Sequence, residues 1–308
     1  MKEKKLLIFG GSGLVGTACR KIFDDSKSYK IFAPTRKQAN LFNLNSVKKI
    51  ILEVDPDIVI NAAARVGGII ANNTYRTEFI LENLKININL FEALIPHNKT
   101  KIINLGSSCI YPLNAPNPIK ESSFMEGKLE ETNSPYAIAK ISAIEIGRSL
   151  NKQFGHEIIN LMPTNLYGPN DNFDRENSHV IPGLMGRLHE AKIKNNPIFS
   201  AWGDGTPKRE FLFSEDLALA IKFLLENQIN IDLINVGFGE EISIKELLVK
   251  IKNIVGYKGK INFDISKPNG NPNKLLDGSL LKSLGWKPKY KLDFGLKKTY
   301  SWYLKNLN

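Results

Sequence analysis

The chain has 308 residues, 42% of them hydrophobic, and carries a formal net charge of +11. This apolar content suffices for a large core in one or two domains, and no apolar run approaches the roughly 20 residues that span a bilayer. The excess lysines are scattered singly, which favours a solvated basic surface over nucleic-acid binding, and the two cysteines and four histidines show no metal-ligand spacing.

Strand-like and helix-like segments alternate through the first half of the chain. The apolar run at residues 6–9 is too short for a signal peptide, so we expect a cytoplasmic protein with reduced cysteines. Further strands are predicted at residues 29–33, 57–64, 101–106 and 157–162, and helices up to residue 25, at residues 46–54 and 75–94, and around residue 136. This alternation predicts βαβ units and a Rossmann-type, doubly wound parallel sheet, an α/β fold.

The pattern changes after residue 168. Loops rich in Asn, Asp, Gly and Pro now separate amphipathic segments at residues 184–193, 216–225 and 244–255. We therefore predict a dinucleotide-binding domain at residues 1–168 and a smaller, mainly helical substrate domain at residues 169–308. The apolar run at residues 233–237 is expected to rejoin the main sheet, so that residues 209–240 partly return to the first domain.

A glycine-rich turn joins the first predicted strand to the first helix. It reads Gly10-Gly11-Ser12-Gly13-Leu14-Val15-Gly16. The spacing of Gly10, Gly13 and Gly16 permits a tight turn, a close approach of a pyrophosphate and close helix–strand packing. A glycine turn without a ligand is the alternative, but the strand–turn–helix context predicts a dinucleotide site. No Gly-Lys-Ser/Thr follows, which excludes a nucleotide-triphosphate P-loop.

The residues after the second strand discriminate between NAD and NADP. An acidic residue there would bind the ribose 2′-hydroxyl, whereas an arginine would accept a 2′-phosphate. The sequence reads Pro34-Thr35-Arg36-Lys37, with no acidic residue nearby. Arg36 therefore predicts NADP(H) as the cofactor.

Tyr136 and Lys140 stand four residues apart on a predicted helix and so share one face. An ammonium beside a phenol is expected to lower the pKa of Tyr136 and make it a proton donor or acceptor. Ser107 follows the predicted strand at residues 101–106, at the sheet edge where ligands bind. Taken singly, these residues are better explained as a half-buried Tyr, a solvated Lys and a turn Ser.

Taken together, the glycine turn, Ser107, Tyr136 and Lys140 resemble the extended short-chain dehydrogenase/reductase family. Several stretches are similar to the GDP-L-fucose synthase group of that family, and they lie at residues 64–69, 71–74, 105–112, 135–140, 162–169, 177–182, 209–212, 255–259 and 275–277. The resemblance implies 3,5-epimerisation of GDP-4-keto-6-deoxy-D-mannose followed by NADPH-dependent reduction of the C4 keto group.

The resemblance also assigns catalytic roles. Cys109 and His179 would exchange the C3 and C5 protons, while Tyr136 protonates the C4 oxygen, Ser107 orients it and Lys140 tunes Tyr136 and holds the nicotinamide ribose. Without the resemblance, Cys109 is better explained as a small buried hydrophobic residue and His179 as a helix N-terminal residue.

The resemblance extends to the binding residues. Besides the glycine turn and Arg36, it implies cofactor contacts at Leu105, Gly106, Ser107, Ser108, Lys140, Pro163, Thr164, Asn165, Leu166 and His179. It implies substrate contacts at Arg187, Trp202, Arg209 and Asn269, with Lys274 near the diphosphate. It further implies a GDP-sugar as ligand and a homodimer formed through two helices per subunit. We expect neither a metal, a nucleic acid nor a membrane as a partner.

The sequence departs from the group at residues 269–274. Asn269-Gly270-Asn271-Pro272-Asn273-Lys274 replaces the Asp-Gly-Thr-Pro-Arg-Lys of many members, and Asn43 replaces an acidic residue near the adenine. A related epimerase or 4-reductase acting on a different nucleotide sugar is therefore the alternative. A non-catalytic NADP-binding sensor and a Cys/His hydrolase are disfavoured, because a sensor needs no Ser–Tyr–Lys set and a hydrolase would leave the glycine turn unexplained.

Overall fold

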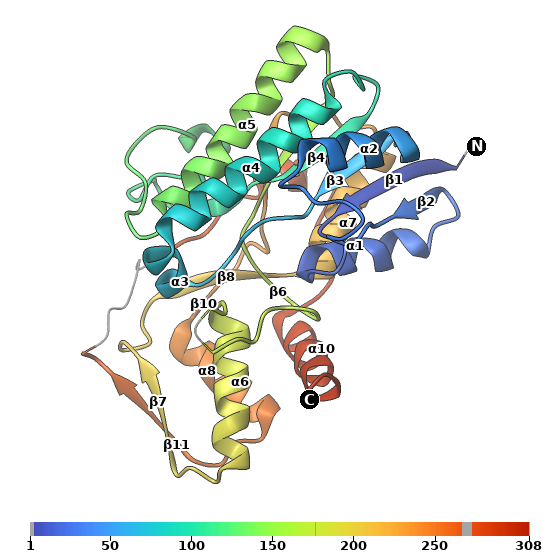
Figure 1. The fold of residues 1–308 in the computed structure, drawn as a ribbon. Helices are drawn as coiled ribbons and strands as arrows, with labels where there is room; N and C mark the ends of the chain where they lie inside the picture. Colours follow the sequence, from blue (N-terminus) through green and yellow to red (C-terminus); the bar gives the residue numbers. More distant parts are fainter. Residues whose placement is uncertain (1–2, 176, 267–272, 308) are drawn as a thin grey trace.

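The computed structural model describes residues 3–175, 177–266 and 273–307, and within them a six-stranded parallel sheet forms the upper part of the molecule (Figure 1). The strand order is β2-β1-β3-β4-β5-β9. The strands are β1 (Lys4–Phe9), β2 (Tyr29–Phe32), β3 (Ile58–Asn61), β4 (Lys101–Leu105), β5 (Ile158–Pro163) and β9 (Leu233–Val236). β9 lies where the apolar run at residues 233–237 predicted a return to the sheet.

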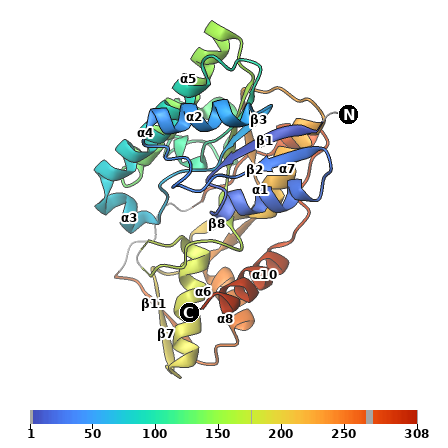
Figure 2. The ribbon, with the colours of Figure 1, turned by 45° about the vertical axis from the view of Figure 1, so that its right-hand side comes forward.

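Helices cover both faces of this sheet, and alternate side chains of each strand point to opposite faces. Leu6 and Ile8 of β1 pack into the core beneath α1 (Leu14–Asp24) and α7 (Ser214–Glu226). Leu7 and Phe9 pack into the core on the other face. That face is covered by α2 (Leu44–Val54), α4 (Arg76–Leu94) and α5 (Ser134–Phe154). Figure 2 shows α1 and α7 together on one side and α2, α4 and α5 on the other.

A second, smaller lobe lies below the sheet (Figure 1). Its helices are α6 (Val180–Ile193), α8 (Ile244–Val255) and α10 (Leu292–Lys305). Its strands are β6 (Asn165–Tyr167), β8 (Lys208–Phe213) and β10 (Glu241–Ser243) in one sheet and β7 (Ile198–Trp202) and β11 (Lys260–Asp264) in another. Leu188, Phe199 and Leu248 belong to its separate apolar core. Short helical segments are α3 (Ile69–Thr74), η1 (Ser108–Ile110), η2 (Glu121–Ser123) and α9 (Ser279–Ser283).

The predicted elements of the first half are present, with one shortened strand. The strand predicted at residues 57–64 ends at Asn61, because the chain leaves the sheet there and leads into α3, which the sequence analysis did not identify. In the second half the helices α6, α7 and α8 match the amphipathic segments, but the strands β6, β7, β8, β10 and β11 were not predicted. These strands have three to six residues each, and they form two small sheets whose pairing depends on partners distant in the sequence.

The described part of the chain contains no helix that is both long enough and apolar enough to cross a membrane.

Candidate active site

The glycine turn lies at the point where the strand order of the sheet reverses, between β1 and β3. Gly10 has φ +77°, and a Cβ atom there would lie 2.7 Å from the Ala62 carbonyl carbon. A Cβ atom on Gly16 would collide with the Gly10 carbonyl oxygen. Because both positions require glycine, α1 can pack directly against the turn and the ends of β1 and β3 can meet. In open α/β sheets this reversal point is where ligands bind.

The same turn has the features that a dinucleotide pyrophosphate requires. α1 begins after Gly13, and no side chain caps its first N–H groups. A Cβ on Gly13 would meet only the Gly10 oxygen, 3.6 Å away, so the space in front of the turn is open. Gly11 packs against Ala33, which brings the loop that carries the exposed Arg36 beside the turn. The residues present therefore fit a phosphorylated dinucleotide.

Ser107, Tyr136 and Cys109 come together at the end of β4. Gly106, which follows the strand, lies against the tip of the Met162 side chain, so a Cβ atom there would require Met162 to move. The next residue, Ser107, accepts a hydrogen bond from the Cys109 amide at 3.2 Å, and its hydroxyl is hydrogen-bonded to the phenol of Tyr136 on α5. The Cys109 side chain is close enough to Tyr136 to act on its charge. The structure thus assembles three predicted residues from two elements.

Lys140 is buried one helical turn beyond Tyr136. Its ammonium donates a 2.7 Å hydrogen bond to the Leu105 carbonyl and lies 5.7 Å from the centre of the Tyr136 ring. Burial lowers the pKa of Lys140 to about 8.

The predicted lowering of the Tyr136 pKa is wrong for this structure. Burial raises the pKa of Tyr136, the nearby Cys109 raises it further, and the hydrogen bond from Ser107 offsets this only in part. The physical reason is that Lys140 directs its proton to the Leu105 carbonyl and not to the phenol. Tyr136 therefore carries its proton at neutral pH.

The loop after β3 is held in place by α4. Asn83 of α4 accepts a hydrogen bond from the Arg65 amide and donates one to the Arg65 carbonyl, both at 3.0 Å. Asn72 of α3 donates to the carbonyl of Gly67 at 2.7 Å. Buried asparagines thus replace a sheet ladder for a segment that has left the sheet.

This loop in turn holds the segment that leads to His179. The Gly68 amide donates to the Asn177 carbonyl at 3.2 Å, and a Cβ on Gly68 would lie 2.6 Å from the Ser178 oxygen. His179 follows as the N-cap of α6, with a solvent-accessible ring in surroundings that still lower its pKa by desolvation. His179 therefore extends from the lower lobe, whereas Cys109 belongs to the upper one.

Comparison with known proteins agrees with this geometry. Residues 6–237 match the NAD dependent epimerase/dehydratase family. The chain belongs to that family. GDP-L-fucose synthase 1 of Arabidopsis thaliana is 46% identical over 99% of this chain and 95% of its own length. GDP-L-fucose synthase of Escherichia coli (strain K12) is 45% identical over 99% of this chain and 98% of its own.

A solved structure of the same family resembles the whole molecule. The crystal structure of a GDP-L-fucose synthetase from Naegleria fowleri bound to NADP superposes with a TM-score of 0.90. It is 29% identical and covers 99% of this chain and 96% of its own.

Arg187 and Trp202, two of the predicted substrate residues, lie next to each other in the lower lobe. The Arg187 guanidinium donates to the Ser200 carbonyl at 2.6 Å and lies 6.0 Å from the centre of the Trp202 ring. Trp202 is 49% exposed, so one part of its surface is available to a ligand. Burial lowers the pKa of Arg187, although a guanidinium remains charged in proteins.

The other two predicted substrate residues are not part of this pair. Arg209 lies on β8, where burial lowers its pKa and the charge of Glu241 opposes that shift. Asn269 lies outside the described residues, so its predicted role stays a prediction.

The predicted cofactor residues after β5 form the crossing between the two lobes. Pro163 ends β5, and Thr164 and Asn165 donate side-chain hydrogen bonds to the Glu210 carbonyl at 3.2 and 2.9 Å. Leu166 packs against the core beneath α1 and α7. Asn43, predicted near the adenine, caps α2 by accepting from the Ser46 amide. The structure thus shows what these side chains contact within the protein, and their predicted cofactor contacts stay predictions.

Sequence reasoning missed Glu210, which is fully buried. Its carboxylate accepts hydrogen bonds from the amides of Gly239 at 2.7 Å and Leu276 at 3.1 Å. Burial raises the pKa of Glu210, and these donors partly offset the rise. The available signal was an acidic residue directly before the apolar run Phe211-Leu212-Phe213, because a carboxylate in such a strand needs internal partners.

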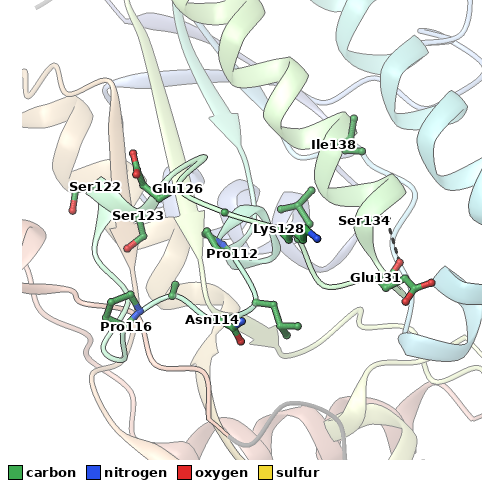
Figure 3. Close-up of a pocket in the computed structure, with 14 residues that line it drawn as sticks. Pro112, Asn114, Pro116, Ser122, Ser123, Glu126, Lys128, Glu131, Ser134 and Ile138 are labelled. Atoms are coloured by element: carbon green, nitrogen blue, oxygen red, sulfur yellow. Dashed lines mark hydrogen bonds between the residues drawn. The ribbon is translucent and has the colours of Figure 1, made fainter.

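Two adjoining cavities lie along residues 112–115, and one of them is lined by Cys109. The larger, of about 1060 Å³, is formed by residues of the 112–134 segment together with Ile138, and Figure 3 shows Glu126, Lys128 and Glu131 among the residues that line it. The smaller, of about 30 Å³, is lined by Cys109 and Lys274. Both share Pro112, Leu113 and Ala115. Among the residues that the structure describes, none predicted for the site lines the larger cavity, whereas Cys109 lines the smaller one, which we therefore assign to the site.

Proposed function

We propose that the protein converts GDP-4-keto-6-deoxy-D-mannose to GDP-L-fucose, by 3,5-epimerisation followed by NADPH-dependent reduction of the C4 keto group. The observation that carries the proposal is the hydrogen bond between Ser107 and Tyr136 with Cys109 beside it. Ser107 and Tyr136 would serve the reduction, and Cys109 would serve the epimerisation as an acid or base. The two relatives that are 45% and 46% identical are both GDP-L-fucose synthases and support the same assignment.

NADP(H) is the proposed cofactor. The uncapped start of α1 and the open space before Gly13 suit the binding of its pyrophosphate, and the exposed Arg36 suits the binding of its 2′-phosphate. The Naegleria fowleri structure holds NADP. When bound, NADPH supplies the hydride that reduces C4. Lys140, charged below about pH 8, would hold the nicotinamide ribose and add positive charge near the reacting oxygen.

In the reduction, Tyr136 donates its proton to the oxygen of C4. Its raised pKa keeps the phenol protonated until the oxygen becomes basic. The Ser107 hydroxyl is already hydrogen-bonded to the phenol and orients the same oxygen.

In the epimerisation, the C4 keto group acidifies the protons on C3 and C5. One of Cys109 and His179 removes a proton, and the other returns one to the opposite face of the sugar. Their origin in different lobes suits an approach from two sides. Desolvation lowers the pKa of His179, so its protonated form gives up a proton readily.

The test is product analysis by NMR with GDP-4-keto-6-deoxy-D-mannose and NADPH in D₂O. The proposal expects GDP-L-fucose that carries deuterium at C3 and C5. Reduced product without deuterium at either carbon would instead support a simple 4-reductase. Absence of any NADPH oxidation with this and related keto-sugars would support a sensor.

We also propose that residues 1–168, with part of 209–240, bind the cofactor and that residues 169–308 bind the nucleotide sugar. The glycine turn in the upper lobe and the Arg187–Trp202 contact in the lower lobe support this division.

We further propose a homodimer formed through α4 and α5. These helices pack side by side (Figure 1) and expose Leu81, Ile88 and Ile138, each more than 40% accessible. A second copy of the same pair would cover these apolar side chains.

A further inference from the structure

A second arginine, Arg20 of α1, lies beside the glycine turn. Its Nη1 atom donates a 3.4 Å hydrogen bond to the carbonyl of Gly11. A Cβ atom on Gly11 would lie 3.6 Å from the Cδ atom of Arg20 and 2.7 Å from the Cβ atom of Ala33. The side chains of Arg20 and Ala33 therefore approach the turn at the same residue, one from α1 and the other from the end of β2.

The loop after β2 brings Arg36 to the same place. Arg36 lies three residues after Ala33, so the two Cα atoms are at most about 11 Å apart. Its guanidinium lies 4.9 Å from the centre of the Phe42 ring, a cation–π contact that orients the side chain. The Gln38 side chain accepts hydrogen bonds from the amide and the hydroxyl of Thr35, both at 2.9 Å. Arg36 therefore stands in a hydrogen-bonded turn beside α1, as Figure 2 lets the reader follow.

The positive charges of the two arginines are not neutralised by the protein. Both side chains are exposed, and within the described part of the chain neither forms an ion pair with a carboxylate. The next residue of α1, Lys21, is different, because it pairs with Glu215 of α7 at 2.6 Å. The glycine turn at residues 10–16 carries no charged side chain. Arg20 and Arg36 thus supply uncompensated positive charge beside a neutral turn.

A phosphate monoester is the chemical group that two such guanidiniums recognise best. Each guanidinium carries five N–H donors in a planar fork and can bind two phosphate oxygens at once. The bond from Arg20 to Gly11 uses one donor and, at 3.4 Å, is longer than the range of about 2.7–3.2 Å that most such bonds cover. A phosphate monoester carries between about −1.5 and −2 charges at pH 7, whereas a hydroxyl is neutral. Two arginines therefore favour a phosphorylated ribose over an unmodified one.

We propose that Arg20 is a specificity-determining residue that binds the 2′-phosphate of NADP(H) together with Arg36. The phosphate is then recognised from α1 as well as from the loop after β2. This inference deepens the proposed function and rests on its assignment of NADP(H) as the cofactor. It divides the choice of NADP(H) over NAD(H) between two elements, although the residues after β2 are the ones from which the sequence predicts that choice.

A purely architectural role for Arg20 makes a different prediction. Its hydrogen bond to the Gly11 carbonyl would then hold the glycine turn, on which NADPH and NADH place the same pyrophosphate. Loss of this bond would weaken the binding of both cofactors equally. A contact with the 2′-phosphate acts on NADPH alone, because NADH carries a hydroxyl at that position. The ratio of the two dissociation constants therefore separates the two roles.

The experiment is calorimetric titration of the full chain, without nucleotide sugar, with NADPH and NADH and with the fragments 2′,5′-ADP and ADP. We expect Arg20→Met to raise the Kd of NADPH and of 2′,5′-ADP about tenfold and to change that of NADH and ADP by less than about twofold. Arg20→Lys should recover part of the loss, because it keeps the charge without the planar fork. Lys27→Met removes an exposed cation at the other end of β2 from Arg36, so this charge-matched control should bind NADPH like the wild type.

Thermal unfolding shows whether a variant is folded, and Arg20→Gln replaces Arg20→Met if the latter is not. Equal weakening of NADPH and NADH binding would assign the architectural role and overturn the proposal, and unchanged NADPH binding would overturn it as well. A wild type that binds NADH as tightly as NADPH has no 2′-phosphate contact, which is also a refutation. If the wild type acts on no keto-sugar, the proposed reaction fails, yet the titrations still decide the role of Arg20.

Discussion

At the scale of single residues, the pKa values of Tyr136 and Lys140 both depart from the ordinary values of these side chains, and burial is the largest cause for each. The pKa of Tyr136 rises and that of Lys140 falls, so that burial favours the neutral form of both groups. For Tyr136 the neutral form is the one that donates a proton. The environment therefore suits the direction of reduction from ketone to alcohol.

Replacing Tyr136 by Phe should remove reduction while sparing epimerisation. The aromatic ring is kept and only the hydroxyl that donates the proton is lost. We expect NADPH oxidation to fall by at least about 10²-fold, while deuterium still enters C3 and C5. Cys109→Ser is the reciprocal variant, with slowed exchange and intact NADPH binding. Normal reduction by Tyr136→Phe would contradict the assigned role.

Lys140 predicts a pH dependence of stability. Its pKa is about 8 in the folded protein, below the 10.5 of an ordinary lysine, so the unfolded chain binds the proton more tightly. The resulting cost is fully present below pH 8 and disappears as the pH rises towards 10.5. The free energy of unfolding of the wild type, relative to Lys140→Met, should thus increase by about 2 kcal/mol from pH 8 to pH 10.

Urea unfolding of both proteins at the two pH values measures this difference, because other titrating groups contribute equally to each. A difference that stays constant between pH 8 and pH 10 would show that Lys140 keeps an ordinary affinity for its proton.

At the scale of elements, the glycine turn combines architecture with ligand binding. Gly16 lies against the Gly10 carbonyl, and Gly10 lies against the residues that follow β3. The close approach of α1 to the sheet is therefore possible only because glycine has no side chain at these two positions. The start of α1 is the part of the turn that faces the open space.

A methyl group at residue 16 should therefore weaken cofactor binding as well as the fold. Gly16→Ala must push α1 away from Gly10, and we expect a loss of stability of about 1–3 kcal/mol together with at least tenfold weaker NADPH binding. Gly155→Ala is the control, because Gly155 ends α5 with φ +76° and no atom near its Cβ position. It should lose about 1 kcal/mol of stability and bind NADPH normally, as fluorescence titration can show.

At the scale of the whole molecule, the site draws on both lobes. The glycine turn, Ser107, Tyr136 and Lys140 belong to the upper lobe, whereas His179, Arg187 and Trp202 belong to the lower one. The connection at Thr164 and Asn165 joins the lobes, and Lys274 lies 3.7 Å from the sulfur of Cys109. A substrate bound between the lobes would therefore meet its acid and its base from opposite sides.

The proposed dimer is testable by charge insertion. Ile88→Glu on α4 would bury an unpaired carboxylate in the interface, so we expect a shift from dimer to monomer in analytical ultracentrifugation. Leu52→Glu on α2, where the leucine is 74% exposed, is the matched control and should leave the dimer intact. A monomeric wild type would refute the assembly without affecting the site.

The sequence by itself determined the parallel sheet, the glycine turn and the order of the proposed catalytic residues along the chain. Apolar periodicity and the glycine spacing act over a few neighbouring residues and can be read without the fold. The five short strands of the lower lobe were not visible in this way, because their pairing depends on distant partners.

Only the tertiary structure decided the protonation of Tyr136 and the partners of Cys109. A pKa depends on burial and on where a neighbouring donor points, and Lys140 points to the Leu105 carbonyl. Lys274 reaches Cys109 because Glu210, Glu241 and Asn235 bind residues 274–277, and no local pattern encodes contacts across 165 positions.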